Sequence, residues 1–191
     1  CLTWTEFDKR ISQVANALIA NGIMPNERIA ILGRNCLAYL EVFFGGLRAG
    51  ACVTPLSTLA HPDSLAKMIT DSESKVLFIS KEYLGTISTL KGLDATAVIL
   101  EGTSESDVDT RSETETHKRF EDFIAPFTGC QPDRSASRDY LLPEHGFNLI
   151  YSSGTTGIPK GILQQRQYRA QESSDVLVAG WIDENSRFLV S

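Results

Sequence analysis

One short segment of the chain combines the residue types that bind phosphate groups. Residues 151–162 read Tyr-Ser-Ser-Gly-Thr-Thr-Gly-Ile-Pro-Lys-Gly-Ile and follow an apolar run at 147–150. Glycines let backbone N–H groups approach an anion closely, hydroxyls add donors, and a lysine adds a compact positive charge on a long stem. The glycines are Gly154, Gly157 and Gly161, the hydroxyl residues are Ser152, Ser153, Thr155 and Thr156, and the cation is Lys160. This composition predicts a phosphate-binding loop over residues 151–162.

Other phosphate-binding and catalytic motifs do not fit the spacing of this segment. A Walker loop needs Gly-Lys followed by Ser or Thr, whereas Ile158 and Pro159 separate Gly157 from Lys160 here. The G-x-G-x-x-G dinucleotide pattern and the G-x-S-x-G nucleophile elbow do not match it either. An ordinary surface loop of small residues is the plain alternative, but the density of hydroxyls and glycines around one lysine argues against it.

The segments around this loop alternate between helical and strand patterns. Apolar strands separated by helices are typical of βαβ crossovers, so we expect an α/β fold with a mostly parallel sheet flanked by helices. The helix signals are a capping box at Thr3 and Glu6 with a stop at Asn21-Gly22, a cap at Asn35 with a stop at Gly50, and a start at His61-Pro62. The expected strands are Arg28–Leu32, Ala51–Thr54, Lys75–Ile79, Ala95–Leu100 and Phe147–Tyr151.

Apolar residues at helical spacing predict which face of each helix packs inward. The expected inward sets are Phe7, Ile11, Val14, Ala15 and Leu18 in the first helix, Leu37, Leu40, Phe44 and Leu47 in the second, and Leu65, Met68 and Ile69 in the third. Residues 101–119 are acidic and polar with few apolar side chains, so we expect a solvated loop there.

Composition narrows the classes of partner. The chain has 191 residues, 42% of them hydrophobic, with 18 Lys and Arg against 24 Asp and Glu, a net charge of −6. This is ordinary globular composition, and the acidic balance disfavours nucleic acid, so small-molecule chemistry is favoured. Glu41 and Arg48 interrupt the longest apolar stretch, Tyr39 to Val53, and no transmembrane segment is expected. The composition neither indicates nor excludes a homo-oligomer.

The cysteines indicate a reducing compartment. Cys1, Cys36, Cys52 and Cys130 show no C-x-x-C spacing, so neither a zinc site nor any other metal site is expected. Cys36 and Cys52 lie in apolar stretches and are expected to be structural rather than reactive. The sparse use of cysteine predicts a cytoplasmic protein.

The 151–162 segment resembles the signature phosphate-binding loop of the adenylate-forming (AMP-binding) superfamily, and the rest of the chain is closest in character to acyl-CoA synthetases. Further likeness lies in residues 2–7, in 47–56 and in 71–78. The resemblance implies that residues 1–191 are the N-terminal part of the large domain of such an enzyme. The chain stops before the family's later motifs, so we expect a fragment that is incomplete for catalysis.

The resemblance also implies a reaction. A carboxylic acid attacks the α-phosphate of ATP to give an acyl adenylate, and a thiol, expected to be coenzyme A, then displaces AMP. Catalytic roles fall on Lys160 and Thr155, and phosphate binding on Ser152, Ser153, Gly154, Thr155, Thr156, Gly157 and Lys160, with Mg²⁺ sharing the charge. A non-catalytic nucleotide-binding or scaffold protein derived from the same fold is the alternative.

Arg166 departs from the family pattern, because relatives usually carry histidine at this place. We expect Arg166 on the opening turn of the next helix. Two interpretations are open: a solvated side chain, or a guanidinium that reaches the carboxylate or phosphate side of the pocket.

Overall fold

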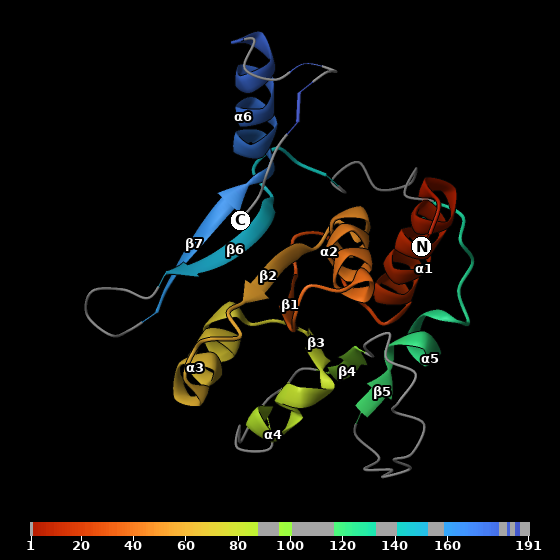
Figure 1. The fold of residues 1–191 in the computed structure, drawn as a ribbon, viewed down its shortest axis with the longest axis vertical. Helices are drawn as coiled ribbons and strands as arrows, with labels where there is room; N and C mark the ends of the chain where they lie inside the picture. The colour runs from red at the N-terminus through yellow and green to blue at the C-terminus, as the bar shows by residue number, and fades with distance from the viewer. Residues whose placement is uncertain are drawn as a thin grey trace.

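The computed structural model of the chain describes residues 2–87, 96–100, 117–132, 141–152, 159–179, 183 and 186–187. Within these ranges seven strands form one sheet in the order β5-β4-β3-β1-β2-β6-β7 (Figure 1). Neighbouring strands are parallel, except that β6 and β7 are antiparallel. The predicted α/β class with a mostly parallel sheet is confirmed. The strands are β1 (Arg28–Leu32), β2 (Cys52–Leu56), β3 (Val76–Ser80), β4 (Thr96–Leu100), β5 (His117–Arg119), β6 (Gly146–Ser152) and β7 (Lys160–Gln165).

Helices cover both faces of the sheet because successive side chains of a buried strand point in opposite directions. Ile29 and Ile31 of β1 belong to the core shared with α1, α2 and α5, whereas Ala30 and Leu32 belong to the core shared with α3. The short η1 and α4 lie on the α3 side. The helices are α1 (Trp4–Ala20), α2 (Leu37–Ala49), α3 (Pro62–Ser72), η1 (Lys81–Tyr83), α4 (Leu84–Ile87), α5 (Phe120–Ile124) and α6 (Arg166–Val178).

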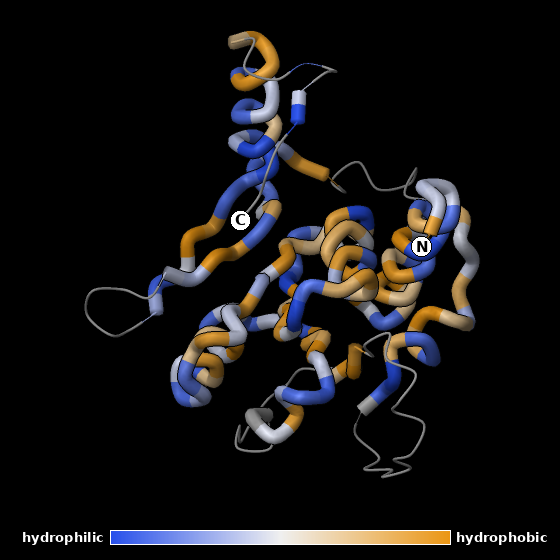
Figure 2. Tube along the Cα trace, viewed as in Figure 1, coloured by the Kyte–Doolittle hydropathy of each residue, from blue (hydrophilic) through white to orange (hydrophobic). Residues whose placement is uncertain are grey.

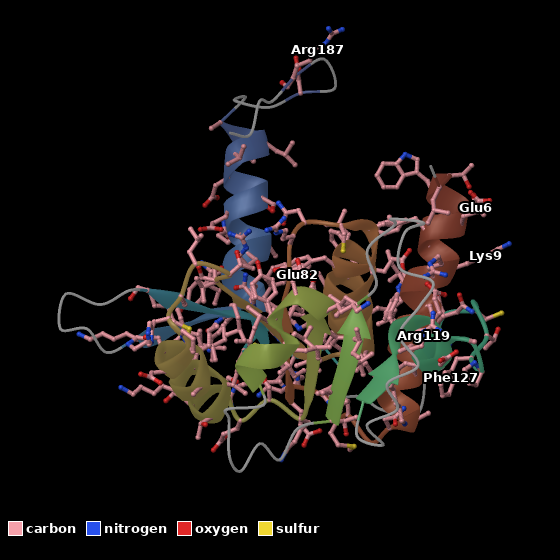
Figure 3. All side chains as sticks on the ribbon, turned by 60° about the horizontal axis from the view of Figure 1, so that its bottom comes forward. Glu6, Lys9, Glu82, Arg119, Phe127 and Arg187 are labelled. Carbon is pink, nitrogen blue, oxygen red and sulfur yellow. The ribbon has the colours of Figure 1, made fainter. Side chains whose placement is uncertain are left out.

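The first and third helices follow the sequence signals closely. Thr3 Oγ1 accepts a hydrogen bond from the Glu6 N–H at 3.2 Å, and the Glu6 carboxylate accepts one from the Thr3 N–H at 2.7 Å, so the capping box is confirmed. Figure 3 shows Glu6 and Lys9 pointing outward from α1. In α3, His61 is the N-cap, and the inward set of Leu65, Met68 and Ile69 is confirmed.

The predicted inward face of α2 is largely wrong. Leu37, Leu40 and Phe44 are 38–48% exposed, while Val42 and the pair Gly45-Gly46 are buried. A Cβ on Gly45 would lie 2.5 Å from the side chain of Val14, and one on Gly46 would lie 2.5 Å from Ile29. The close approach of α2 to α1 and β1 therefore requires the glycine face, and the larger apolar residues point away from it.

Two smaller predictions also need correction. The N-cap of α2 is Cys36, which makes no side-chain capping bond, so Asn35 is not the cap. Within the acidic loop expected over 101–119, residues 101–116 lie outside the described part, but His117–Arg119 form β5, which pairs in parallel with β4. The backbone hydrogen bonds of the sheet edge hold these three residues despite their polarity.

An ion-pair network joins three helices on one face. Arg10 of α1 donates to Glu41 of α2 (Nε to Oε1, 2.6 Å) and to Glu121 of α5 (NH2 to Oε1, 2.5 Å), and its guanidinium lies 5.8 Å from the ring centroid of Phe120. The side chain of Glu41 is only 1% exposed, against 25% for Arg10 and 55% for Glu121. Burial lowers the pKa of Arg10, but the bonds to Glu41 and Glu121 outweigh it and raise that pKa overall.

The C-terminal part of the described chain extends from the layered core. α6 has no buried residue and is hydrophilic along most of its length (Figure 2). None of the helices in the described ranges is long and apolar enough to cross a bilayer.

Candidate functional site

The predicted phosphate-binding segment begins in β6 and ends in β7, two antiparallel strands that pair as a hairpin. Tyr151 and Ser152 end β6, while Lys160, Gly161 and Ile162 begin β7, with Ser152 opposite Lys160. The sequence suggested a loop leading toward a helix, so β7 was missed. Its residues are mostly exposed, which removes the apolar alternation that signals a strand. Ser153, Gly154, Thr155, Thr156 and Gly157 lie outside the described residues.

The mouth of the hairpin is the place where β6 ends at Ser152 and β7 begins at Lys160, and it carries one hydroxyl and one cation. Ser152 and Lys160 are both exposed and occupy facing positions on adjacent strands. Facing residues of an antiparallel pair lie only about 5 Å apart at Cβ. A lysine in water beside a hydroxyl suits an anionic group that approaches the mouth from outside.

Tyr151 fixes the hairpin next to this mouth. Its hydroxyl donates to Asp71 Oδ2 of α3 at 2.6 Å, and its ring packs against the core on the α3 face. Burial raises the pKa of Tyr151 above its usual value, and the bond to Asp71 raises it further, so the hydroxyl stays a donor at neutral pH.

Gly161 lets two neighbouring side chains of β6 pack against the backbone of β7. A Cβ at this position would lie 3.1 Å from Leu149 Cδ1 and 3.2 Å from Tyr151 Cε1. The sequence assigned this glycine to close approach of an anion, whereas the structure places the side chains of Tyr151 and Leu149 over it.

Arg166 anchors the base of the hairpin. It begins α6, as expected, but its NH2 group donates to the backbone oxygens of Ala51 (3.1 Å) and Leu47 (3.4 Å) at the end of α2. Leu47 is in the last turn of α2, whose carbonyls carry the partial negative charge of a helix C-terminus, and Ala51 follows the C-cap Gly50. The interpretation of a solvated side chain is wrong, because Arg166 is half-buried and its guanidinium bonds to backbone carbonyls. A contact with the carboxylate or phosphate side of the pocket stays a prediction. Gly146 N–H adds a second anchor by donating to Asn26 Oδ1 at 2.8 Å.

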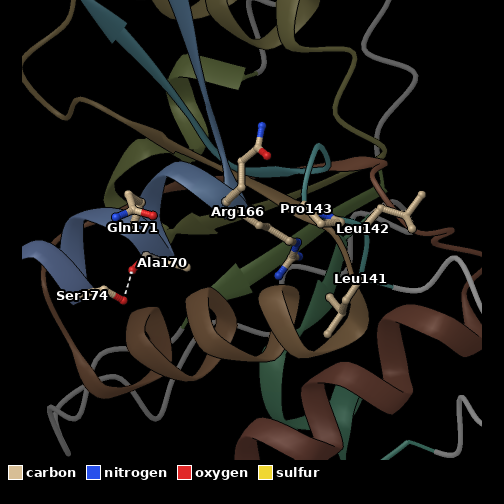
Figure 4. Close-up of a pocket in the computed structure, with 8 residues that line it drawn as sticks. Leu141, Leu142, Pro143, Arg166, Ala170, Gln171 and Ser174 are labelled. Carbon is tan, nitrogen blue, oxygen red and sulfur yellow. Dashed lines mark hydrogen bonds between the residues drawn. The ribbon is translucent and has the colours of Figure 1, made fainter.

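A shallow hollow of about 470 Å³ lies on the outer side of this anchor (Figure 4). Residues 141–143 line it on one side and α6 on the other, with Arg166 between them. In α6, Ser174 Oγ bonds back to the carbonyl of Ala170 at 3.0 Å. The hollow thus sits at the base of the hairpin, at the end away from Ser152 and Lys160.

The thiols and metal ligands give no second centre in the described chain. Cys52 is buried beside Gly146, and burial raises the pKa of its thiol to about 11. This value suits the structural role expected for it. Cys36, Cys52 and Cys130 are all unbridged. No three His, Cys, Asp or Glu side chains of the described residues gather as a metal site would require.

Comparison with known proteins assigns the chain to a family of adenylate-forming enzymes. A family model described as AMP-binding enzyme matches residues 1–190, so the chain belongs to this family. YdaB of Bacillus subtilis (strain 168), whose name assigns it provisionally to the acyl-CoA ligases, is 32% identical over 160 residues, or 83% of this chain and 29% of YdaB. A feruloyl-CoA synthase of an Amycolatopsis species is 28% identical over 190 residues, which cover the whole of this chain and 33% of that protein.

A solved relative supports the same fold. The anthranilate CoA ligase AuaEII, crystallised with anthranoyl-AMP, superposes with a TM-score of 0.71 at 26% identity, covering 88% of this chain and 30% of AuaEII. The chain therefore spans about a third of the length of these relatives. The recognition of the family from residues 151–162 is confirmed.

Proposed function

We propose that this chain supplies the phosphate-binding part of an acid–thiol ligase. In the first step a carboxylate oxygen attacks the α-phosphorus of ATP, and the bond to the β-phosphate bridging oxygen breaks to release pyrophosphate. In the second step a thiolate attacks the acyl carbon, and the carbon–oxygen bond to AMP breaks. Coenzyme A is the proposed thiol donor.

The hairpin geometry carries this proposal. Ser152 and Lys160 face each other at an exposed mouth, and the intervening residues supply three further hydroxyls and two glycines. Negative charge builds on the departing pyrophosphate, and fixed donors aimed at developing charge are the strongest contribution a protein makes to such a step. We assign this role to Lys160 and Thr155, and phosphate binding to Ser152, Ser153, Gly154, Thr156 and Gly157.

Relatives support the class of reaction. YdaB, the feruloyl-CoA synthase and the anthranilate CoA ligase are all named for joining an acid to coenzyme A. Their acids differ, so the acid of this protein is left as a carboxylic acid of unspecified structure. The three free thiols of the described chain suit the proposed cytoplasmic location.

We also propose that Mg²⁺ enters with ATP. The described residues include no group of three His, Cys, Asp or Glu side chains that could hold a metal ion. The ion supplies charge neutralisation on the phosphates when it enters with the nucleotide.

The test is acid-dependent ATP–pyrophosphate exchange by the longest open reading frame that contains residues 1–191. Lys160→Ala should lower the exchange rate by about 100-fold or more, with less effect on the KM of the acid, because its charge meets the leaving group. Lys118→Ala is the matched control, since Lys118 is an exposed lysine on β5 at the opposite edge of the sheet. A Lys160→Ala rate within about twofold of wild type contradicts the assigned role.

The same assay separates the ligase from the scaffold alternative. ATP binding with no exchange for any acid in a broad panel favours the non-catalytic protein. We further propose that residues 1–191 alone form no acyl-CoA, because they span about a third of the relatives' length. Thioester formation by the purified 191-residue chain contradicts this.

A further inference from the structure

The hairpin is joined to the rest of the sheet through β6, which lies beside β2. Its tip is the part around Ser152 and Lys160, where β6 ends and β7 begins. β6 pairs with β2 through the single register pair Val53 and Asn148, whereas β6 and β7 pair with each other along their length. Figure 1 shows the hairpin extending beyond β2 on the side where α3 lies. The anchors made by Gly146 and Arg166 are at the base, so they do not fix the direction of the tip.

Tyr151 is the described side chain that ties the tip to the rest of the fold. It lies one residue before Ser152 and pairs with Gly161 of β7, the glycine that its ring covers. Through its hydroxyl it reaches Asp71 on α3, a residue 80 positions earlier in the chain. β7 also runs beside α3, so the bond closes a short span between helix and hairpin.

We propose that Asp71 is a positioning residue for the phosphate-binding loop, and that its carboxylate holds the tip of the hairpin against α3 by accepting the Tyr151 hydroxyl. This inference rests on the proposed function, because it assumes that residues 152–160 bind phosphate. Asp71 itself acts through Tyr151 and touches no phosphate. Its effect is to reduce the range of positions from which Ser152 and Lys160 meet their ligand.

The tyrosine is suited to this task because its ring and hydroxyl contact different elements. The ring covers Gly161 of β7 and packs against the α3-side core, and the hydroxyl bonds to α3. Loss of the hydroxyl therefore leaves the packing intact while releasing the link. Tyr151→Phe and Asp71→Ala should have the same effect, and Asp71→Asn should preserve the link because an amide oxygen can accept the same bond.

The first arm of the test measures the link without any ligand. Amide hydrogen exchange at residues 149–152 and 160–162 should speed up about fivefold in Tyr151→Phe and Asp71→Ala, since a hydrogen bond to a charged acceptor at a partly exposed site is lost. Exchange at Gly146 and Arg166 should stay at the wild-type rate. Tyr168→Phe, which removes the hydroxyl of an exposed tyrosine on α6, is the matched control.

The second arm measures affinity for inorganic pyrophosphate by calorimetry with the 191-residue chain. We expect Asp71→Ala and Tyr151→Phe to weaken binding about three- to tenfold and Asp71→Asn to restore it within about twofold. Unchanged tip exchange in Asp71→Ala overturns the link itself. Faster tip exchange with unchanged pyrophosphate affinity overturns the positioning role. If wild type binds no pyrophosphate, the proposed phosphate site and the positioning role both fail, while the exchange arm still reports on the link.

Discussion

Replacing Arg10 by methionine should destabilise the fold much more than replacing its partner Glu41. Methionine keeps the length of the side chain but leaves the Glu41 carboxylate, 1% exposed, without the guanidinium bonded at 2.6 Å. Its other oxygen, Oε2, already has no hydrogen-bond partner among the described residues. An uncompensated buried charge costs about 3–5 kcal/mol, a large share of the roughly 5–15 kcal/mol that stabilises a typical domain.

Replacing Glu41 by methionine should lower the free energy of unfolding less than replacing Arg10. In Glu41→Met, Arg10 keeps Glu121 and its guanidinium is 25% exposed to water, so we expect a loss of about 1–2 kcal/mol. The double variant Arg10→Met/Glu41→Met buries no charge at this place. It should be more stable than Arg10→Met alone by about 2 kcal/mol or more, because a buried ion pair replaced by apolar side chains costs little.

Urea unfolding of the four proteins at about pH 7 measures this cycle. The reasoning is refuted if Arg10→Met costs under about 1 kcal/mol at pH 7, or if the double variant shows the sum of the two single losses.

Three further predictions test other parts of the structure. Arg166→His shortens the side chain so that it no longer reaches the carbonyls at the end of α2, and it should lower the free energy of unfolding by about 1–2 kcal/mol; an unchanged urea midpoint contradicts this anchor. In native protein at about pH 8, a thiol reagent should modify exposed Cys130 quickly and buried Cys52, whose pKa is raised to about 11, only as fast as the chain opens; equal rates contradict the burial of Cys52. Gly45→Ala places a Cβ 2.5 Å from Val14 and should cost about 1–3 kcal/mol, part of which Val14→Ala restores in a double variant; a thermal midpoint equal to wild type for Gly45→Ala contradicts the close helix contact.

Local signals predicted most of the elements correctly. The capping box at Thr3, the stop at Gly50 and the proline after His61 are all chemical features of single turns, and the structure confirms each of them. β1 was predicted to the residue because its apolar run is buried on both faces. The loop motif likewise identified the family from one short segment.

The errors arise where a distant partner decides the outcome. The face of α2 depends on how closely Val14 and Ile29 approach, and no periodicity of the helix itself records that distance. Arg166 binds carbonyls 115 and 119 positions earlier, and backbone carbonyls have no sequence signature. The bond from the Tyr151 hydroxyl to Asp71 was missed for the same reason, because the two residues lie 80 positions apart in the chain.

The order in which the contacts of the hairpin become available follows from its anchors. Both sheet neighbours of β1, the strands β2 and β3, lie within the first 80 residues. The centre of the sheet therefore forms by closing short stretches of chain, which costs little conformational entropy. The partners of the hairpin, Asn26, Ala51 and Asp71, all lie in that early part, between 80 and 120 positions before the groups they bond. During synthesis from the N-terminus, β6 and β7 therefore emerge after all of these partners, and the hairpin that carries the proposed phosphate-binding segment is among the last described elements able to dock.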